Sequence, residues 1–337
     1  MSLPDGHPNV RFGKTATLIV NLGTPTEPTA KALRPYLKEF LSDRRVIEAS
    51  PLIWQPILRG IILNTRPRKS AKAYAKIWNR ETNESPLRYY TRRQAELLQK
   101  KLKGRSDVFW AMRYGKPSIE DTLKDMRAQG YDRISVIALY PHYSASTSAS
   151  VYDHVFRALM RMRWQPAIRT APPWHDHPAF ISALEKSLKK HIRGLGWKPE
   201  KIILSYHGLP QAYFDKGDPY HCHCQKTTRL LREKMGYGAE QMITTFQSRF
   251  GPTKWLEPYT DKTVESLGQS GIKKILVITP GFISDCVETL EEIGIELQET
   301  FMSHNGSHFS VVPCLNDTPQ SIDLLSTISE SELMGWS

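Results

Sequence analysis

The sequence predicts an α/β protein with two doubly wound domains, each a parallel sheet with helices on both faces. Two observations support this prediction. Short β-branched apolar runs alternate with longer amphipathic stretches, and the alternation occurs as two series within 337 residues. Apolar strands followed by helices are typical of parallel sheets that helices cover. The length suits two domains of ordinary size.

The expected strands begin with three in the first half, at residues 15–23, 108–115 and 133–141. Five more follow in the second half, at 166–172, 201–208, 242–248, 273–281 and 308–315. Helices are expected between them, notably at 117–129, 177–195, 227–235 and 285–301. A boundary near 144–150 divides the chain into domains 15–145 and 146–316, with a helical extension at 317–337.

Residues that follow the strands are the first candidates for a site, because ligands of open parallel sheets bind beyond the strands' carboxyl ends. His207 ends one strand and precedes Gly208. An imidazole at this edge can accept a proton near neutral pH. A structural, hydrogen-bonded histidine is the alternative, and position alone does not separate the two.

The segment 285–301 carries an acidic stripe. At ~100° per residue, one helix face holds Asp285, Glu288, Glu292, Glu296 and Glu299. Spacing alone favours a solvated surface helix. However, none of these acids has Lys or Arg four residues on, and the helix begins at a strand's carboxyl end. Carboxylates at this spacing could pass a divalent cation along the helix.

The charge of +12 is unevenly distributed. All 46 basic residues lie at or before Lys274 and ten of the 34 acidic residues follow it, which gives net charges of +22 and −10. The basic body suits an anionic partner: nucleic acid, a lipid surface or a carboxylated small molecule. Because no GxGxxG, P-loop or recognised nucleic-acid module occurs, we expect neither nucleotide nor nucleic acid. No membrane span or export signal is apparent, so we expect the cytoplasm.

Four cysteines do not form a disulfide scaffold, and we expect reduced thiols. Cys222 and Cys224, one residue apart, could both reach one iron, and a [2Fe–2S] cluster would then need Cys286 and Cys314. The spacing matches no common zinc or ferredoxin pattern. The expectation is therefore no cluster.

Residues 51–63 are apolar on several faces and are flanked by Arg44, Arg45, Arg66, Arg68 and Lys69. A buried helix is the ordinary interpretation. The alternative is an exposed lip that admits a flat apolar ligand, or that dips into a bilayer whose headgroups contact the arginines. On this alternative we expect Ile53, Trp54, Ile57 and Leu58 to be partly exposed.

Six blocks in order resemble the ferrochelatase family. They are 18–25 (LIVNLGTP), 111–115 (AMRYG), 140–150 (YPHYSASTSAS), 205–220 (SYHGLPQAYFDKGDPY), 246–257 (FQSRFGPTKWLE) and 279–293 (TPGFISDCVETLEEI). Members insert ferrous iron into protoporphyrin IX in the last step of haem synthesis. The resemblance implies two Rossmann-like domains with a porphyrin cleft between them. It also implies Fe²⁺ and protoporphyrin IX as substrates and no required cofactor.

The resemblance also assigns residues. It places His207, as the acceptor of pyrrole protons, and Glu288 at the metal-insertion centre. The expected porphyrin-binding residues are Leu22, Arg113, Tyr114, Tyr140 and Trp255. The expected metal or proton path adds Asp285, Glu292 and Glu296. Many members read SDHxETL, whereas this chain has Cys286 at the histidine position. The sequence does not decide whether protoporphyrin or coproporphyrin is the natural substrate, and it does not decide the oligomeric state.

Overall fold

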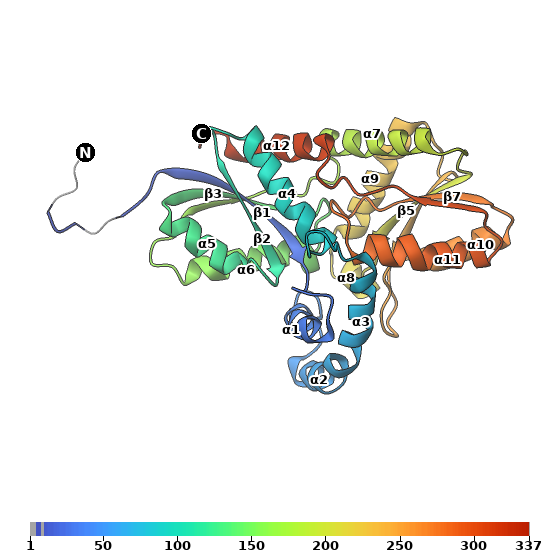
Figure 1. The fold of residues 1–337 in the computed structure, drawn as a ribbon, viewed down its shortest axis with the longest axis horizontal. Coiled ribbons are helices and arrows are strands. Elements are labelled where there is room, and N and C mark those ends of the chain that lie inside the picture. Colours follow the sequence, from blue (N-terminus) through green and yellow to red (C-terminus); the bar gives the residue numbers. More distant parts are fainter. Residues whose placement is uncertain (1–4, 8–9, 337) are drawn as a thin grey trace.

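The computed structural model describes residues 5–7 and 10–336, which form two parallel sheets lying side by side (Figure 1). The first sheet contains β1 (Lys14–Gly23), β2 (Asp107–Tyr114), β3 (Tyr131–Ala138) and β4 (Ala167–Thr170). The second contains β5 (Lys201–His207), β6 (Met242–Gln247), β7 (Lys274–Ile278) and β8 (His308–Val311). The predicted α/β class and the eight predicted strands are confirmed.

Helices cover both sheets. Around the first sheet lie α4 (Pro86–Lys101), α5 (Ile119–Ala128), the π-helix η2 (Ala145–Ala149) and α6 (Ser150–Met160). Around the second lie α7 (Pro178–Gly194), α8 (Gln211–Asp215), α9 (Tyr220–Met235), α10 (Thr260–Gln269), the π-helix η3 (Glu288–Leu297) and α11 (Gln298–Ser303). The last helix, α12 (Pro319–Leu333), crosses back to the first unit, where it packs on β3 and α4, and it also contacts α7 (Figure 1). The largest apolar core runs through both units and includes Ile19, Ile137, Leu204 and Phe246.

The two sheets have the same topology, β2-β1-β3-β4 and β6-β5-β7-β8. One expectation was wrong: the strand predicted at 166–172 as part of the second series pairs in parallel with β3. The helix α6 returns the chain from β3 to that neighbouring position, as a parallel crossover requires. The first sheet therefore extends to Thr170, beyond the boundary expected near residue 145.

Each strand order reverses direction beside its central strand, between β1 and β3 in one sheet and between β5 and β7 in the other. Such switch points open a crevice beyond the carboxyl ends of the strands. Leu22 and Tyr140 lie at the first switch point, and His207 and Glu288 lie at the second. The topology thus places these four residues, which lie far apart in the sequence, at equivalent positions of the two sheets.

A separate layer projects beyond the first sheet: α1 (Ala30–Leu41), α2 (Pro51–Ile57), the π-helix η1 (Leu58–Ile62) and α3 (Leu63–Ile77). Figure 1 shows α2 at the tip of this layer. A small core of its own, which includes Leu33, Leu58 and Tyr114, joins the layer to the end of β2. In the part of the chain that is described, no helix is long and apolar enough to cross a bilayer.

Candidate functional site

His207 is the last residue of β5, and its side chain is half-buried. Its Nδ1 lies 2.7 Å from the carbonyl oxygen of Gly208. Because a carbonyl oxygen only accepts, Nδ1 carries the proton in the neutral ring and Nε2 presents a lone pair. The imidazole is therefore oriented to accept a proton at Nε2.

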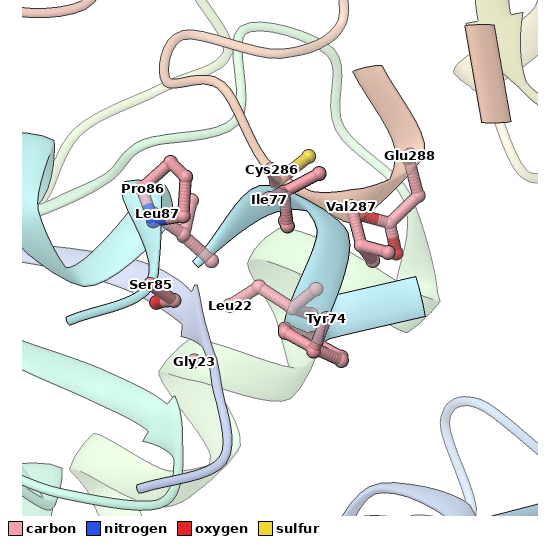
Figure 2. A pocket seen from close by; sticks show the side chains of 10 residues that line it. All are labelled: Leu22, Gly23, Tyr74, Ile77, Ser85, Pro86, Leu87, Cys286, Val287 and Glu288. Atoms are coloured by element: carbon pink, nitrogen blue, oxygen red, sulfur yellow. The ribbon is translucent and has the colours of Figure 1, made fainter. Parts of the chain in front are cut away.

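Glu288 opens η3 and faces a pocket between the two units (Figure 2). The first unit contributes Leu22 and Gly23 from the end of β1, and Tyr74 from α3. Further lining comes from Ile77, Ser85, Pro86, Leu87, Cys286 and Val287. In Figure 2 the segment that carries Glu288 lies across the pocket from Leu22. The acid therefore faces an apolar wall that belongs to the other sheet.

The acidic segment is a π-helix over Glu288–Leu297, where an α-helix was expected. Its i→i+5 bonding changes the expected 100° spacing, and single π turns are frequent at functional sites. On a solvated helix face all five acids would be exposed, but here their burial differs. Asp285 is buried, Glu288 and Glu292 are half-buried, and Glu296 and Glu299 are exposed. The series therefore leads from solvent towards the pocket.

Glu292 is fixed against the end of β6. Its carboxylate accepts from the Ser248 N–H at 2.7 Å, from the Ser248 hydroxyl at 2.6 Å and from Gln247 Nε2 at 3.2 Å. Burial raises the pKa of Glu292, and the negative charge of Glu288 raises it further. The Ser248 hydrogen bond and the nearby His207 partly oppose this rise. The three ionisable groups of the expected centre are thus electrostatic neighbours.

Asp285 has a different environment from the other acids. Its oxygens accept from Asn316 Nδ2 at 2.6 Å and from the Thr289 hydroxyl at 2.9 Å, while Asn316 Oδ1 accepts from the Asp285 N–H at 2.8 Å. These bonds tie the start of η3 to the loop after β8. The structure therefore places Asp285 in a buried anchoring network, and Glu296 at the exposed end of the series.

Arg113 and Tyr114, at the end of β2, are buried in a network centred on Asp43. Arg113 Nη2 pairs with Asp43, Arg113 Nε donates to the Ser150 hydroxyl at 2.6 Å, and the Tyr114 hydroxyl donates to Asp43 at 2.7 Å. Burial alone would raise the pKa of Asp43, but these hydrogen bonds and the arginine charge lower it. Sequence reasoning missed Asp43, because its partner lies 70 positions away.

Two polar atoms near this network are buried without a hydrogen-bond partner: Arg113 Nη1 and the Tyr140 hydroxyl. Burial raises the pKa of Tyr140 well above its usual value, and Tyr114 and Glu288 add to this effect. Buried polar atoms without partners are rare in native proteins, so these two are candidates to contact a bound polar ligand.

Trp255 packs against the strand end that carries His207. Its Cε3 lies 3.1 Å from where a Cβ on Gly208 would be, and residue 255 forms an isolated β-bridge with Pro210. The indole N–H donates to the Phe250 carbonyl at 2.9 Å. A Cβ at position 208 would also lie 2.7 Å from the Gln247 carbonyl oxygen, which explains the glycine that follows His207.

Arg66 on α3 contacts Phe250 from the other unit, with its guanidinium carbon 4.1 Å from the ring centroid. Arg66 is half-buried, and burial lowers its pKa. Among the described residues, no carboxylate forms a salt bridge with it. The sequence indicated Arg66 only as a flank of the apolar lip, and its contact with the other unit depends on the tertiary structure.

A [2Fe–2S] cluster on the four cysteines would require Cys222 and Cys224 to point towards the same iron, and they do not. Cys222 is exposed and Cys224 is buried on α9, and residues two apart on an α-helix point about 200° away from each other. The premise that both reach one iron is therefore wrong. Within the described residues, no group of three or more His, Cys, Asp or Glu side chains could hold a metal ion.

The lip is exposed at several of its apolar positions: Leu52 is 87%, Ile53 65%, Ile57 38% and Ile61 58% accessible. The expectation of exposure was wrong for Leu58, which is fully buried in the small core of the layer. Trp54 is half-buried and donates its indole N–H to the Leu41 carbonyl at 2.6 Å.

Comparisons with known proteins agree with this geometry. A sequence model of the ferrochelatase family matches residues 14–333. The chain is 55% identical to a protein named ferrochelatase from Agrobacterium fabrum, with 99% of this chain and 98% of that protein covered. It is 54% identical to a ferrochelatase from Rhizobium meliloti, with 98% of each covered.

Solved structures show the same fold at low identity. SirB from Bacillus subtilis with Fe³⁺ superposes with a TM-score of 0.56 at 13% identity, over 95% of each chain. The sirohydrochlorin chelatase SirB from Bacillus subtilis subspecies spizizenii, in complex with cobalt, gives 0.53 at 12% identity, over 96% of this chain and 97% of that one.

Proposed function

The chain belongs to the ferrochelatase family, a lyase family that inserts ferrous iron into a porphyrin for haem synthesis, and we propose protoporphyrin IX as its substrate. The observation that supports the proposed mechanism is the pairing of the two switch points. Glu288, at the start of η3, lines one pocket together with Leu22, from the end of β1. His207 ends β5, the strand beside β7 in the second sheet. The porphyrin would lie in the cleft between the two switch points.

In this proposal His207 accepts the pyrrole protons one at a time and passes each to the acidic series that leads towards solvent. A porphyrin carries two N–H protons in its central hole, and both must leave when Fe²⁺ binds its four nitrogens. The Gly208 carbonyl holds the proton of His207 on Nδ1, so Nε2 is free to accept. The Glu292 carboxylate, fixed nearby, stabilises the resulting imidazolium.

Glu288 and the π-helix provide the path for metal or protons. Oxygen ligands suit a hard or borderline divalent ion such as Fe²⁺. Glu288 and Glu292 are half-buried and Glu296 is exposed, so the series connects the pocket with solvent. Asp285 contributes by anchoring the start of η3 through Asn316.

The porphyrin walls are Leu22 and Trp255, with Arg113, Tyr114 and Tyr140 at the polar end. Rigid apolar walls can hold a buckled ring, and that distortion exposes the nitrogen lone pairs to the metal. The unpartnered Arg113 Nη1 and Tyr140 hydroxyl supply donors at the edge. Arg66 supplies a cation without a carboxylate partner at the mouth, where a porphyrin propionate would lie.

No resident cofactor is part of the proposal, and Fe²⁺ is a substrate. The reaction changes no oxidation state, so it requires no redox group. The opposite directions of Cys222 and Cys224 disfavour a [2Fe–2S] cluster on the four cysteines. The family assignment and the absence of a nucleotide motif give no reason to expect nucleic acid as a partner.

The lip supports a peripheral membrane contact. Leu52, Ile53, Ile57 and Ile61 present apolar surface at the tip of the projecting layer, near several basic side chains. This combination suits an anionic lipid surface, where apolar side chains insert and cations contact headgroups. With all four cysteines unpaired, the proposal places the protein in the cytoplasm, in reversible contact with the membrane.

Anaerobic absorbance spectroscopy tests the function. Purified protein is mixed with Fe²⁺ and protoporphyrin IX, and the loss of porphyrin bands with appearance of haem bands is followed. Catalytic turnover is expected, faster than with coproporphyrin under the same conditions. Tight porphyrin binding without turnover would instead indicate a haem- or porphyrin-binding protein. Preference for coproporphyrin would overturn the assigned substrate.

A further inference from the structure

The position of Glu292 depends on one residue outside the acidic helix. Ser248 supplies two of the three hydrogen bonds to its carboxylate, one from the backbone N–H to Oε1 at 2.7 Å and one from the hydroxyl to Oε2 at 2.6 Å. The third comes from Gln247 Nε2, which also donates to the Glu288 carbonyl at 3.0 Å. The end of β6 therefore holds two successive turns of η3.

Ser248 has a backbone φ of 64°, in the left-handed region. This conformation is uncommon for a residue with a Cβ, and it persists where surrounding contacts impose it. Here both polar groups of Ser248 reach the same carboxylate. Gln247, the preceding residue, pairs with His207 in the β5–β6 register. The strand end thus fixes Glu292 relative to the proposed proton acceptor.

We propose that Ser248 is a positioning residue for iron insertion, which holds the Glu292 carboxylate between His207 and Glu288 through its hydroxyl. This inference rests on the proposed function. It differs from a purely structural role, in which Ser248 would serve only the turn that leaves β6. The two roles separate because the turn needs the left-handed backbone, whereas the positioning role needs the Oγ atom.

Two substitutions test this difference. Ser248→Gly removes the hydroxyl and suits a positive φ, whereas Ser248→Ala removes the hydroxyl and disfavours it. If the hydroxyl positions Glu292, both variants lose about 10-fold in kcat/KM for Fe²⁺, as expected for one hydrogen bond to a charged group. The KM for porphyrin should stay unchanged. Normal iron kinetics in Ser248→Gly, with a loss only in Ser248→Ala, would overturn the proposal in favour of the structural role.

A control and a binding measurement complete the experiment. Thr253→Ala changes an exposed position in the same loop and should match wild type. Calorimetric titration of porphyrin-free protein with Zn²⁺ should show the same change in affinity for Ser248→Gly as for Glu292→Gln. Absence of iron insertion by wild type would refute the proposed function, whereas the Zn²⁺ affinities of the variants judge Ser248 separately. Ser248→Gly with wild-type Zn²⁺ affinity, when Glu292→Gln differs, would contradict the positioning role.

Discussion

At the residue scale, the reactivity of His207 follows from a single hydrogen bond. The Gly208 carbonyl fixes the proton on Nδ1, and this leaves Nε2 as the acceptor. A glycine is required there because a Cβ would lie 2.7 Å from the Gln247 carbonyl and 3.1 Å from the Trp255 ring. The short sequence His207-Gly208 therefore encodes both the orientation of the proposed base and the close approach of the Trp255 ring.

Replacing the base should abolish insertion without unfolding the chain. His207→Ala is expected to lower kcat by ~10²–10⁴-fold, the usual contribution of a general base. The side chain is half-buried at a strand end and lies outside the main core, so the thermal unfolding midpoint should change little. Steady-state haem formation and circular dichroism check both statements. Near-normal turnover in the folded variant would refute the assignment.

The acids of the π-helix should differ in importance. Glu288→Gln removes the carboxylate that lines the pocket, whereas Glu299→Gln changes an exposed side chain on α11. Loss of a group that acts directly on the reaction is expected to cost about 100-fold in kcat/KM for Fe²⁺. The exposed control should stay within about twofold of wild type. A weak and equal effect at both positions would support the solvated-face interpretation.

At the element scale, the π-helix joins the two units. Glu291 on η3 pairs with Lys76 on α3 at 2.7 Å, and the Glu291 side chain is only 9% exposed. Lys76 lies in the other unit, so a search for basic residues four positions along the acidic segment does not find this ion pair. The contact holds the acidic helix against the projecting layer and keeps Glu288 directed towards Leu22.

The lip should control membrane contact. Ile53→Ser/Ile57→Ser removes two exposed apolar side chains and should reduce flotation with anionic liposomes, because each buried methylene contributes about 0.8 kcal/mol. Phe156→Ser/Met160→Ser is the matched control, since it changes two exposed apolar residues of α6. Equal flotation of both double variants would reject the lip as the contact.

A stacked histidine pair should make stability depend on pH. The His175 and His223 rings lie 3.7 Å apart, with His142 6.0 Å from His175 and the Asp176–Lys226 ion pair beside them. Burial and the neighbouring His223 lower the pKa of His175 from 6.5 to about 4. Between pH 6.5 and pH 4 the unfolded chain therefore binds more protons than the folded chain. The contribution of the neutral His175 to the free energy of unfolding is complete above pH 6.5 and is lost towards pH 4.

The measurement is the thermal midpoint of unfolding between pH 7.5 and 4.5. His175→Phe keeps an aromatic ring against His223 but cannot be protonated, so its midpoint should fall less than that of wild type over this range. A difference of about 2 °C corresponds to roughly 1 kcal/mol in a chain of this size. Parallel curves for the two proteins would show that the pair does not titrate on unfolding.

At the scale of the whole molecule, the contacts between the two units differ in burial. Buried hydrogen bonds between helices and loops of the two units include Gln94 to the Asn316 carbonyl at 2.7 Å and His142 to Thr227 at 2.9 Å. Arg66 instead contacts an exposed ring, that of Phe250. This contact is therefore easier to displace than the buried hydrogen bonds.

Arg66 should determine porphyrin affinity. Arg66→Gln removes the half-buried cation without a carboxylate partner and is expected to raise the KM for porphyrin about 10-fold, the loss of one charge-assisted contact. Arg68→Gln removes an exposed charge two residues away and should have little effect. Steady-state kinetics at saturating Fe²⁺ distinguish the two. An unchanged KM in both variants would show that Arg66 does not contribute to porphyrin binding.

The sequence by itself determined the strands, the class of fold and the family, because these depend on local hydrophobic patterns and on contiguous motifs. It also identified His207, which ends an apolar strand, as a candidate, and through the family resemblance it identified Glu288. Only the tertiary structure decided which acid faces the pocket, because Asp285 and Glu288 differ in their long-range partners. The same holds for the roles suggested for Asp43, Arg66 and Ser248. Their contacts join positions 44 to 184 residues apart, and a pattern along the chain does not encode such distances.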